Sequence, residues 1–339
     1  MNNIKNNFRL NSLKKKTWLI TGVAGFIGSN ILEKLLYLDQ KVVGIDNLST
    51  GFLKNLKSVE NTVGKKKWKK FKFVKGDVSN LKDCNKVIKN VDIVLHQAAR
   101  GSIPKSTKDP ITTNKYNITA FLNILNVSRE NKIKSFVYAS SSSVYGDSKK
   151  LPKIETNVGN VLSNYALTKK VNEEYARLFF KLYNFKTIGL RYFNVFGKRQ
   201  NPEGDYAAVI PKWINNVKKN HPIIIYGDGR TSRDFCPIAN VVNANILAGI
   251  VNLEPQNYVF NVGTGTRTSL KKLGETIYKY FKIKKNKQKI IFKDFRKGDI
   301  RHSLSDIRKI KKILQYSPID SFNDGISKTV NWFKFNSNV

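Results

Sequence analysis

A glycine-rich turn near the N-terminus constrains the fold of this chain more than any other feature. Residues 17–21 are a short apolar run rich in strand formers, and Gly22, Gly25 and Gly28 follow it at regular spacing. Apolar residues within 26–36 then recur at helical spacing. In this order the first glycine permits a tight turn, the second admits a pyrophosphate to the backbone, and the third lets helix pack on strand. The turn therefore predicts a dinucleotide-binding Rossmann unit.

The second predicted strand, residues 41–45, ends in Asp46, about two dozen residues after Gly22. A carboxylate at this position can accept hydrogen bonds from an adenosine ribose, which favours NAD over NADP. Asp46 and Asn47 are also common residues in the turn that closes a strand. Because three spaced glycines precede them, we expect Asp46 to bind the ribose and Asn47 to lie beside it in the cofactor site.

A Tyr-x-x-x-Lys pair, Tyr165 and Lys169, lies well downstream of the glycine turn. On a helix these positions share a face, so the lysine ammonium can stabilise the tyrosine phenolate. Lowering the tyrosine pKa from ~10 to about 7 requires roughly 4 kcal/mol, which one ammonium and a cationic nicotinamide can supply. The Tyr-x-x-x-Lys spacing often occurs by chance on a solvated helix. Together with the glycine turn, however, it predicts a redox enzyme with Tyr165 as its base.

The order of the remaining elements predicts an α/β fold with a doubly wound parallel sheet. Strand-like runs alternate with helical patterns, the strands in residues 71–74, 91–95, 135–139 and 187–190, and the helices in 81–88, 111–130 and 165–183. After about Asn194 this rhythm breaks into glycine-containing loops and shorter elements. The expected domains are a basic N-terminal extension (1–16), an NAD-binding Rossmann domain (17–193, with later returns near 235–262) and mainly a smaller, interleaved α/β substrate-binding lobe (194–339).

Three later segments refine this expectation. Residues 241–251 have the pattern of a helix, and residues 258–261 have that of a strand that returns to the large sheet. The two lobes are therefore expected to interleave along the chain. Residues 322–335 predict an amphipathic helix near the C-terminus.

The charge of the chain is unusual for its size. Its 339 residues include 61 basic and 24 acidic side chains, which gives a formal net charge of +37 and a pI near 10.1. This composition is an electrostatic footprint for phosphate backbones. No nucleic-acid recognition module accompanies it, and the lysines occur in small groups scattered over the whole length. We therefore expect solvated lysines, some of which attract an anionic diphosphate substrate, and no specific nucleic-acid partner.

The cysteines and histidines give no sign of a metal or disulfide framework. The two cysteines, Cys84 and Cys236, are far apart, and the three histidines show no ligand spacing. We expect no metal and a reducing, cytoplasmic location. Residues 1–16 lack an apolar core for a signal peptide, and no later run approaches a membrane span, so no membrane insertion is expected.

Further motifs accompany the glycine turn and the Tyr165/Lys169 pair, namely Phe73-Val74-Lys75-Gly76-Asp77, His96-Gln97-Ala98-Ala99, Ser141-Ser142-Ser143-Val144-Tyr145-Gly146 and Arg191-Tyr192-Phe193-Asn194-Val195-Phe196-Gly197. With them, from about Lys16 to the C-terminus, the chain resembles the extended short-chain dehydrogenase/reductase family. More narrowly it resembles the bacterial UDP-N-acetylglucosamine 4-epimerases of the WbpP type. The resemblance implies NAD-dependent C4 epimerisation of UDP-GlcNAc and UDP-GalNAc, for surface polysaccharide such as O-antigen. We also expect a homodimer.

The resemblance implies roles for individual residues. Near the cofactor it places Gly22, Gly25, Phe26 and Ile27 at the pyrophosphate with Gly28 beside them, Asp46 and Asn47 at the ribose, Asp77 and Val78 at the adenine, Gln97, Ala98 and Ala99 near the nicotinamide, and Tyr192 as a further contact. For catalysis it implies Tyr165 as base, Lys169 on the nicotinamide ribose, and Ser141 and Ser142 on the sugar hydroxyl. For the substrate it implies Ser102 and Ser143, Asn194 near the diphosphate, Ala208 and Val209 along the uridine, Arg233 and Arg301 on phosphate oxygens, and Ser303 leaving room for an N-acetyl group.

Several of these roles have alternatives. Arginines beside aspartates, such as Arg233 and Arg301, commonly form surface salt bridges, and Ser303 is also a favoured N-cap for a helix over 304–314. Arg100 stands where related epimerases commonly carry a neutral residue. An added positive charge there favours an acidic sugar, as in a UDP-GlcNAcA or UDP-glucuronate 4-epimerase.

Two other functional classes share parts of this pattern. Sugar 4,6-dehydratases share the expected fold but need an acid pair where Ser142 and Ser143 stand. A basic RNA-binding scaffold on a dinucleotide fold is the non-enzymatic alternative. The intact glycine turn, Tyr165 and Lys169 argue against it, because a scaffold has no use for a poised phenolate.

Overall fold

The computed structural model describes residues 13–203, 207–254, 256–295 and 300–336. Most of the expected basic extension, residues 1–12, lies outside the described residues, as does the segment 296–299 just before the Arg301 loop. No helix in the described part of the chain is long and apolar enough to cross a membrane.

Within the described residues, seven strands form one parallel sheet in the order β3-β2-β1-β4-β5-β6-β9. The strands are β1 Thr17–Thr21, β2 Lys41–Asp46, β3 Phe71–Lys75, β4 Ile93–His96, β5 Ser135–Ser141, β6 Thr187–Tyr192 and β9 Asn257–Val262. The order reverses between β1 and β4, which is where a doubly wound sheet opens a crevice for ligands. The predicted fold class is confirmed.

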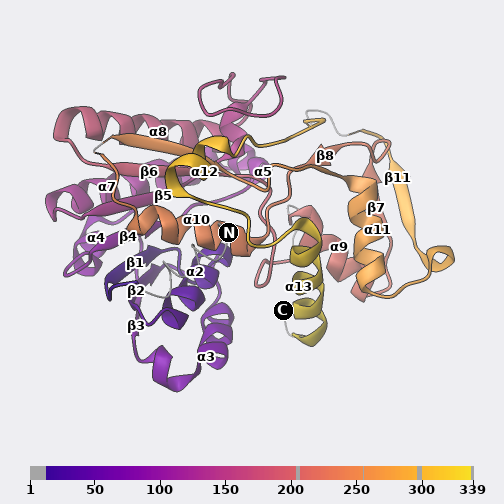
Figure 1. Ribbon diagram of the computed structural model, residues 1–339, viewed down its shortest axis with the longest axis horizontal. Coiled ribbons are helices and arrows are strands. Elements are labelled where there is room, and N and C mark those ends of the chain that lie inside the picture. The colour runs from indigo at the N-terminus through magenta and orange to yellow at the C-terminus, as the bar shows by residue number, and fades with distance from the viewer. Residues whose placement is uncertain (1–12, 204–206, 255, 296–299, 337–339) are drawn as a thin grey trace.

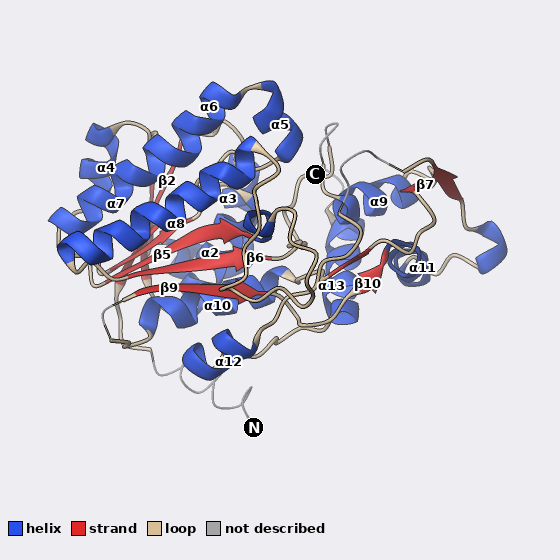
Figure 2. Cartoon of the chain, turned by 90° about the horizontal axis from the view of Figure 1, so that it is seen from above, coloured by secondary structure: helices blue, strands red, loops and turns tan. Residues whose placement is uncertain are grey.

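Helices cover both faces of this sheet (Figures 1 and 2). One face carries α2 Phe26–Tyr37, α3 Leu53–Trp68, α10 Ile238–Ile250 and α12 Arg308–Leu314, and the other carries α4 Leu81–Val87, α7 Ala120–Glu130 and α8 Asn164–Tyr183. In β1, Trp18 and Ile20 enter the core under the first set, whereas Leu19 enters the core under the second. All three are fully buried, as expected of a parallel strand covered on both sides.

The connection from β4 to α7 is more broken than the pattern in 111–130 predicts. It consists of α5 Ile103–Lys108, α6 Pro110–Asn114 and a π-helical turn, Lys115–Thr119, before α7 begins. Asn117 in the π turn accepts a hydrogen bond from the Arg100 backbone (2.7 Å) and donates to Thr168 on α8 (3.0 Å). The irregular turn thus ties the loop after β4 to α8.

A smaller lobe has a hydrophobic core of its own. Its elements are α9 Val209–Lys218, α11 Leu270–Tyr280, α13 Phe322–Phe335, the pairs β7 Ile223–Tyr226 with β11 Ile290–Lys293 and β8 Ser232–Arg233 with β10 Thr268–Ser269, and the 3-10 turn Lys285–Lys287. Trp213, Ile277 and Phe333 are among its buried side chains. The amphipathic helix predicted over 322–335 is confirmed as α13, which a Ser321–Asp324 capping box starts.

The lobes interleave as expected. The strand predicted at 258–261 is β9, which pairs with β6 at the edge of the large sheet, and the helix predicted at 241–251 is α10, which packs under that sheet. One expected helix is wrong at its start. Residues 303–306 are extended because Ser303 N donates to Ser232 O (3.0 Å) and Lys153 N donates to Leu304 O (2.8 Å). The helix therefore begins at Arg308, and Ser303 is not its N-cap.

We predict that Gly28→Ala lowers the free energy of unfolding by about 1–3 kcal/mol, the usual cost of overpacking. An added Cβ would lie 2.2 Å from the Gly22 carbonyl oxygen and 2.8 Å from Val23 Cα. Urea denaturation measures the change. Gly274→Ala in α11 is the control, because its Cβ would meet nothing nearer than 3.7 Å. An equal loss in both variants would contradict the steric argument.

Candidate active site

The glycine turn forms a cradle of exposed backbone between β1 and α2. Gly22 has a left-handed φ of 69°, and a Cβ there would lie 2.9 Å from the Ala98 backbone. Any side chain at this position would therefore clash with backbone, and only glycine fits. Gly25 caps α2, and no described side chain caps this helix N-terminus. Its free N–H groups and its dipole favour an anion such as a pyrophosphate.

Asp46 at the end of β2 supports this cradle. Its Oδ2 accepts from Ala24 N (2.9 Å) and its Oδ1 from Leu48 N (2.8 Å). Burial raises the pKa of Asp46, and these backbone bonds oppose that rise. Asn47 donates to Asp77 Oδ2 (3.1 Å), which links the ends of β2 and β3. Asp46 and Asn47 can therefore close the turn after β2 and also belong to the cofactor site.

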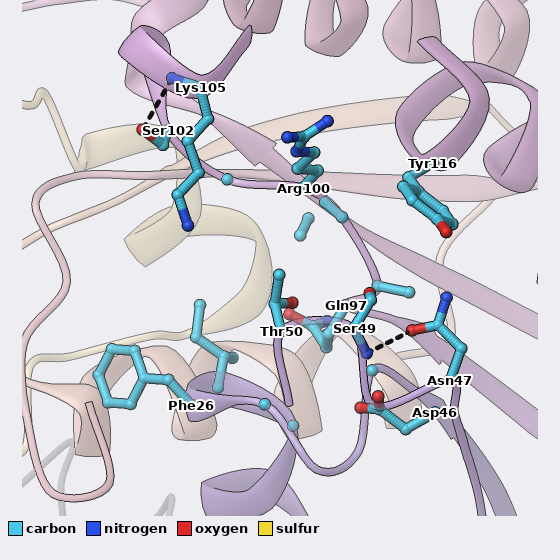
Figure 3. A pocket seen from close by; sticks show the side chains of 18 of the residues that line it. Phe26, Asp46, Asn47, Ser49, Thr50, Gln97, Arg100, Ser102, Lys105 and Tyr116 are labelled. Carbon is cyan, nitrogen blue, oxygen red and sulfur yellow. Dashed lines mark hydrogen bonds between the residues drawn. The ribbon is translucent and has the colours of Figure 1, made fainter. Parts of the chain in front are cut away.

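A cavity of about 1090 Å³ lies over the carboxyl ends of the central strands (Figure 3). Every residue expected at the cofactor lines it: Gly22, Gly25, Phe26, Ile27, Gly28, Asp46, Asn47, Asp77, Val78, Gln97, Ala98, Ala99, Tyr165, Lys169 and Tyr192. From the expected substrate residues, Ser102 and Ala208 line it as well. A single volume thus adjoins the glycine cradle and the tyrosine–lysine pair.

Several lining residues were not predicted from the sequence, among them Ser49, Thr50, Lys105 and Lys108. Ser49 and Thr50 follow Asp46 in the same loop, so the ribose assignment could have found them. Lys105 extends from α5 toward the side of the cavity on which Phe26 lies (Figure 3). Lys108 lies on the same helix. Only the fold of the segment after β4 brings these two lysines to the cavity, so no local pattern signals them.

Tyr165 and Lys169 lie on the first turns of α8, which Ser163 caps. Lys169 Nζ lies 5.9 Å from the centroid of the Tyr165 ring and donates to Ala139 O (2.9 Å). Burial lowers the pKa of Lys169 to about 8. Burial also raises the pKa of Tyr165, and a hydrogen bond with Ser141 opposes this rise. Burial thus sets the direction of the Tyr165 shift, and the lowering expected from Lys169 together with a cationic nicotinamide stays a prediction.

The serine run at the end of β5 divides in the structure. Ser141 contacts Tyr165 and also accepts from Ser143 N (3.1 Å), whereas Ser142 begins a 3-10 turn, Ser142–Tyr145. None of these three serines is among the residues that line the described cavity. Ser140, which the sequence argument passed over, does line it. Of the two serines expected in catalysis, Ser141 is the better placed.

The remaining expected substrate residues, Asn194, Val209, Arg233, Arg301 and Ser303, are not among the residues that line the described cavity. Arg233 donates to Ser232 O (3.1 Å) and to Arg301 O (3.3 Å), so the two arginine loops are adjacent. The Arg301 side chain pairs with Asp228 and lies over the Phe295 ring at 5.0 Å. The surface salt bridge is thus the contact that Arg301 makes in this structure.

Asn194 and Ser303 share this location, and Val209 packs on the core of the same lobe. Asn194 has a left-handed φ of 35° and donates to Asp234 O (3.1 Å), and Val209 begins α9. Ser303 pairs with Ser232 beside Arg233. The structure thus brings Asn194, Arg233 and Ser303 to one end of the smaller lobe.

Arg100 lines the cavity, as a residue near a bound sugar should, but its charge is already paired. Its Nη1 lies 2.7 Å from Asp109 Oδ2, and Asp109 lines the same cavity. The hydrogen bond from Arg100 holds the pKa of Asp109 below its usual range. Asp109 therefore offsets the positive charge that the sequence suggested.

Comparison with protein families settles the class of this site. The model of the NAD dependent epimerase/dehydratase family matches residues 18–263. The chain belongs to this family. The resemblance to the extended short-chain dehydrogenases/reductases is confirmed, and NAD is the cofactor.

Solved structures of family members resemble the whole chain. A UDP-N-acetylglucosamine 4-epimerase from Methanobrevibacter ruminantium, in complex with UDP-N-acetylmuramic acid, is 35% identical with a TM-score of 0.88 over 96% of this chain and 100% of its own. A UDP-glucose 4-epimerase from Thermotoga maritima, with UDP-glucose, is 31% identical (TM-score 0.86, 95% and 100% covered). A UDP-glucuronic acid 4-epimerase from Bacillus cereus, with UDP-glucuronic acid and NAD, is 28% identical (TM-score 0.84, 94% and 99%).

The residues of this family member fit NAD. The cradle that Gly22 and Gly28 keep free of side chains suits a pyrophosphate, and Asp46 faces the same cavity. Tyr192 Oη and Gln97 Oε1 are hydrogen-bonded (2.9 Å), which fixes two of the residues expected at the cofactor.

A buried ion pair supports α8, the helix that carries Tyr165 and Lys169. Arg191 on β6 binds both carboxylate oxygens of Glu173 on α8, at 2.9 and 2.7 Å. Glu173 Oε1 also accepts from Ser140 Oγ (2.5 Å), and Arg191 donates to Glu155 O (3.0 Å). Glu173 and Arg191 are 9% and 4% exposed. The pair fixes α8 against the strand ends that carry Ser140 and Ser141.

We predict that Glu173→Gln lowers the free energy of unfolding by about 3–5 kcal/mol, because it leaves the Arg191 guanidinium buried without its countercharge. The neighbouring Glu174→Gln is the matched control, since Glu174 pairs with Arg177 at the surface (2.8 Å). Its loss is expected to stay within about 0.5 kcal/mol. Chemical denaturation of both variants measures the difference. Equal stabilities would show that the buried pair does not hold this helix.

Proposed function

We propose that this protein is an NAD-dependent 4-epimerase that interconverts UDP-GlcNAc and UDP-GalNAc. Family membership and the UDP-sugar 4-epimerases among the similar structures support the coarser part, C4 epimerisation of a UDP sugar with NAD. The observation that carries the proposal is the cavity that adjoins both the glycine cradle and the Tyr165/Lys169 pair. Surface polysaccharide, including O-antigen, is the proposed destination of the product.

In this mechanism Tyr165 takes the proton of the sugar 4-hydroxyl, and Ser141 orients that hydroxyl through its contact with Tyr165. NAD, which the glycine cradle and Asp46 would hold, would supply the acceptor and donor of the C4 hydride. Lys169, fixed on Ala139 O, contacts the nicotinamide ribose. The net reaction is redox neutral, so the site must retain the keto intermediate between the two transfers.

The smaller lobe supplies the proposed anchor for the UDP moiety. Arg233 and Asn194 lie at one end of this lobe, and Arg301 leaves Asp228 when it binds a phosphate oxygen. An arginine that pairs with a carboxylate can exchange to a phosphate, because each group can accept two hydrogen bonds from the planar guanidinium. Ala208 and Val209 are the proposed contacts of the uridine.

A neutral sugar is favoured over a uronate. The acidic-sugar alternative, a UDP-GlcNAcA or UDP-glucuronate 4-epimerase, rests on an uncompensated positive charge at Arg100. Asp109 lies 2.7 Å from that guanidinium and offsets it. Incubation with UDP-GlcNAc, UDP-GlcNAcA, UDP-glucose and UDP-glucuronate, followed by product analysis, tests the assignment. Conversion confined to the uronates would overturn it.

The other expectations stay predictions. Homodimerisation, a cytoplasmic location and the lack of a specific nucleic-acid partner rest on the sequence. The RNA-scaffold alternative predicts RNA binding that is sequence-selective and persists at high salt. For a merely basic surface, the affinity for nucleic acid falls as salt rises.

Tyr165→Phe is expected to reduce turnover by at least about a hundredfold, because it removes the acid/base group and little of the shape. NAD and UDP binding should change little. Tyr175→Phe, on the same helix and outside the lining of the described cavity, should keep wild-type turnover. Steady-state kinetics and calorimetric titration separate the two effects. Turnover near wild type in Tyr165→Phe would refute the base assignment.

Ser303→Tyr is expected to abolish turnover of UDP-GlcNAc and to spare that of UDP-glucose, because the tyrosine ring fills space that an N-acetyl group needs. The structure removes the competing explanation of a lost helix cap, since α12 begins at Arg308. Ser303→Ala, which adds no bulk, is the control. Equal loss on both sugars, or no loss on either, would remove the gate argument.

A further inference from the structure

A second cavity of about 390 Å³ lies among α2, α10 and α13. Small-molecule sites begin at about 300 Å³, so it can hold a compact ligand. The segment after β6 contributes to both cavities. Phe196 and Lys198 line the second, and Gln200 and Asn201 line the first.

The walls of the second cavity are largely apolar. They include Phe196, Pro237, Ile238, Val242 and Ile319. Such walls favour the apolar body of a ligand, because its transfer from water removes hydrocarbon surface from solvent.

Asn243 on α10 supplies one polar group to this lining. Its side-chain Oδ1 is buried and has no hydrogen-bond partner among the described residues, and the residue is 3% exposed. Buried acceptors are normally paired, so this one is suited to a donor on a ligand. A hydroxyl group in the cavity would satisfy it.

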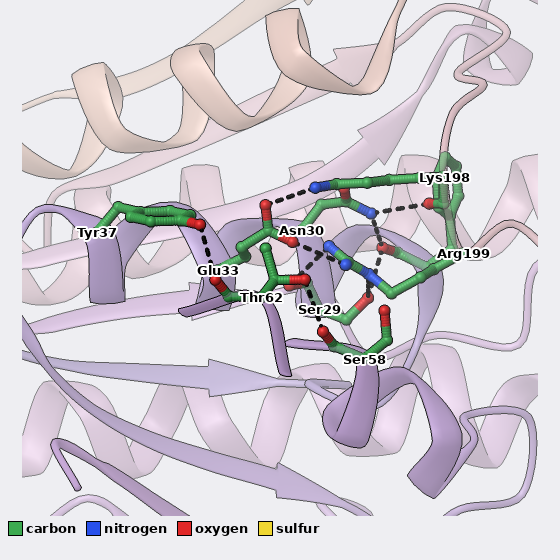
Figure 4. Close-up of polar contacts among 9 residues, drawn as sticks. Ser29, Asn30, Glu33, Tyr37, Ser58, Thr62, Lys198 and Arg199 are labelled. Atoms are coloured by element: carbon green, nitrogen blue, oxygen red, sulfur yellow. Dashed lines mark hydrogen bonds and ion pairs between the residues drawn. The ribbon is translucent and has the colours of Figure 1, made fainter. Parts of the chain in front are cut away.

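Of the three lysines that line the cavity, one has no ion-pair partner among the described residues. Glu33 on α2 is held by Lys198 (2.5 Å) and Arg199 (2.7 Å) (Figure 4). Asp320 pairs with Lys328 (2.5 Å). Lys34, next to Glu33 and half-buried, forms no ion pair with any described residue. The cavity therefore offers an ammonium to an anionic group.

We propose that this second cavity is a binding site for a small amphipathic carboxylate that carries a hydrogen-bond donor at its other end, as a hydroxyaryl carboxylic acid does. Lys34 pairs with the carboxylate, the apolar walls enclose the ring, and Asn243 Oδ1 accepts from the hydroxyl. Nothing in this assignment depends on the reaction at the first cavity.

Calorimetric titration of the NAD-loaded, full-length protein with 4-hydroxyphenylacetate tests the proposal. A dissociation constant of about 0.1–1 mM is expected for a ligand of this size. Two analogues each lack one feature. They are 4-methylphenylacetate, without the hydroxyl, and tyramine, with an ammonium in place of the carboxylate. Each should bind about 5–10-fold more weakly, as for one lost polar contact.

Matched variants assign each preference to a residue. Asn243→Leu should abolish the preference for hydroxyl over methyl, and Lys34→Met the preference for carboxylate over ammonium. Lys312→Met, at a lysine outside the described lining, should keep both preferences. Ala239→Trp should fill the cavity and abolish binding of all three compounds while NAD binding persists.

Several results would overturn the proposal. They are no binding by wild type up to about 10 mM, well above the expected range, undiminished binding in Ala239→Trp, or analogue preferences that survive both Lys34→Met and Asn243→Leu. Because the measurement is direct binding, absence of epimerase activity would count against the proposed function and leave this test intact. If Asn243→Leu fails to fold, the Lys34 and Ala239 variants still decide.

Discussion

The buried ion pair between Glu173 and Arg191 is the contact on which the geometry of the active site depends. Desolvation of two charges is costly unless good geometry and further hydrogen bonds compensate, and both are present. Ser140 and the Glu155 carbonyl complete the polar shell, and the Arg191 guanidinium lies 4.9 Å from the Tyr145 ring centroid. The pair raises the pKa of Arg191 against the lowering effect of burial. Arg191 therefore keeps its charge. The ion pair joins α8, which carries Tyr165 and Lys169, to β5 and β6.

A second buried carboxylate, Asp234, organises the smaller lobe with no cationic partner among the described residues. It accepts from Thr264 N (2.9 Å), Gly265 N (3.1 Å) and Ser305 Oγ (2.5 Å), so two distant loops converge on one side chain. Burial raises the pKa of Asp234, and these hydrogen bonds oppose the rise. Its neighbour Arg233 and the 303–305 segment owe their relative position to it. Asp234 thus positions Arg233, a residue expected at the diphosphate, although Asp234 itself is not expected to contact the diphosphate.

Local patterns predicted the parts of the molecule that local physics decides. The glycine turn, Asp46 and the Tyr165/Lys169 pair follow from backbone sterics, strand length and helical periodicity, and the sheet follows from alternating strands and helices. Long-range pairing decided the rest. Arg191 and Glu173 are 18 residues apart, and Asp234 and Ser305 are 71 apart. Ser303 failed as a helix cap because residue 304 pairs with Lys153, a contact that no pattern around it could signal.

The pKa values of Tyr165 and Lys169 are shifted in opposite directions by the same cause, burial. Burial disfavours the charged form of each, so it raises the pKa of the phenol and lowers that of the ammonium to about 8. Lys169 Nζ donates to Ala139 O, and among the described residues no hydrogen bond joins it to the Tyr165 hydroxyl. A further positive charge in the same low-dielectric cavity acts on the tyrosine more strongly than it would in water. In the proposed mechanism, a cationic nicotinamide beside Tyr165 would therefore oppose the effect of burial and favour the phenolate that takes the proton of the sugar hydroxyl.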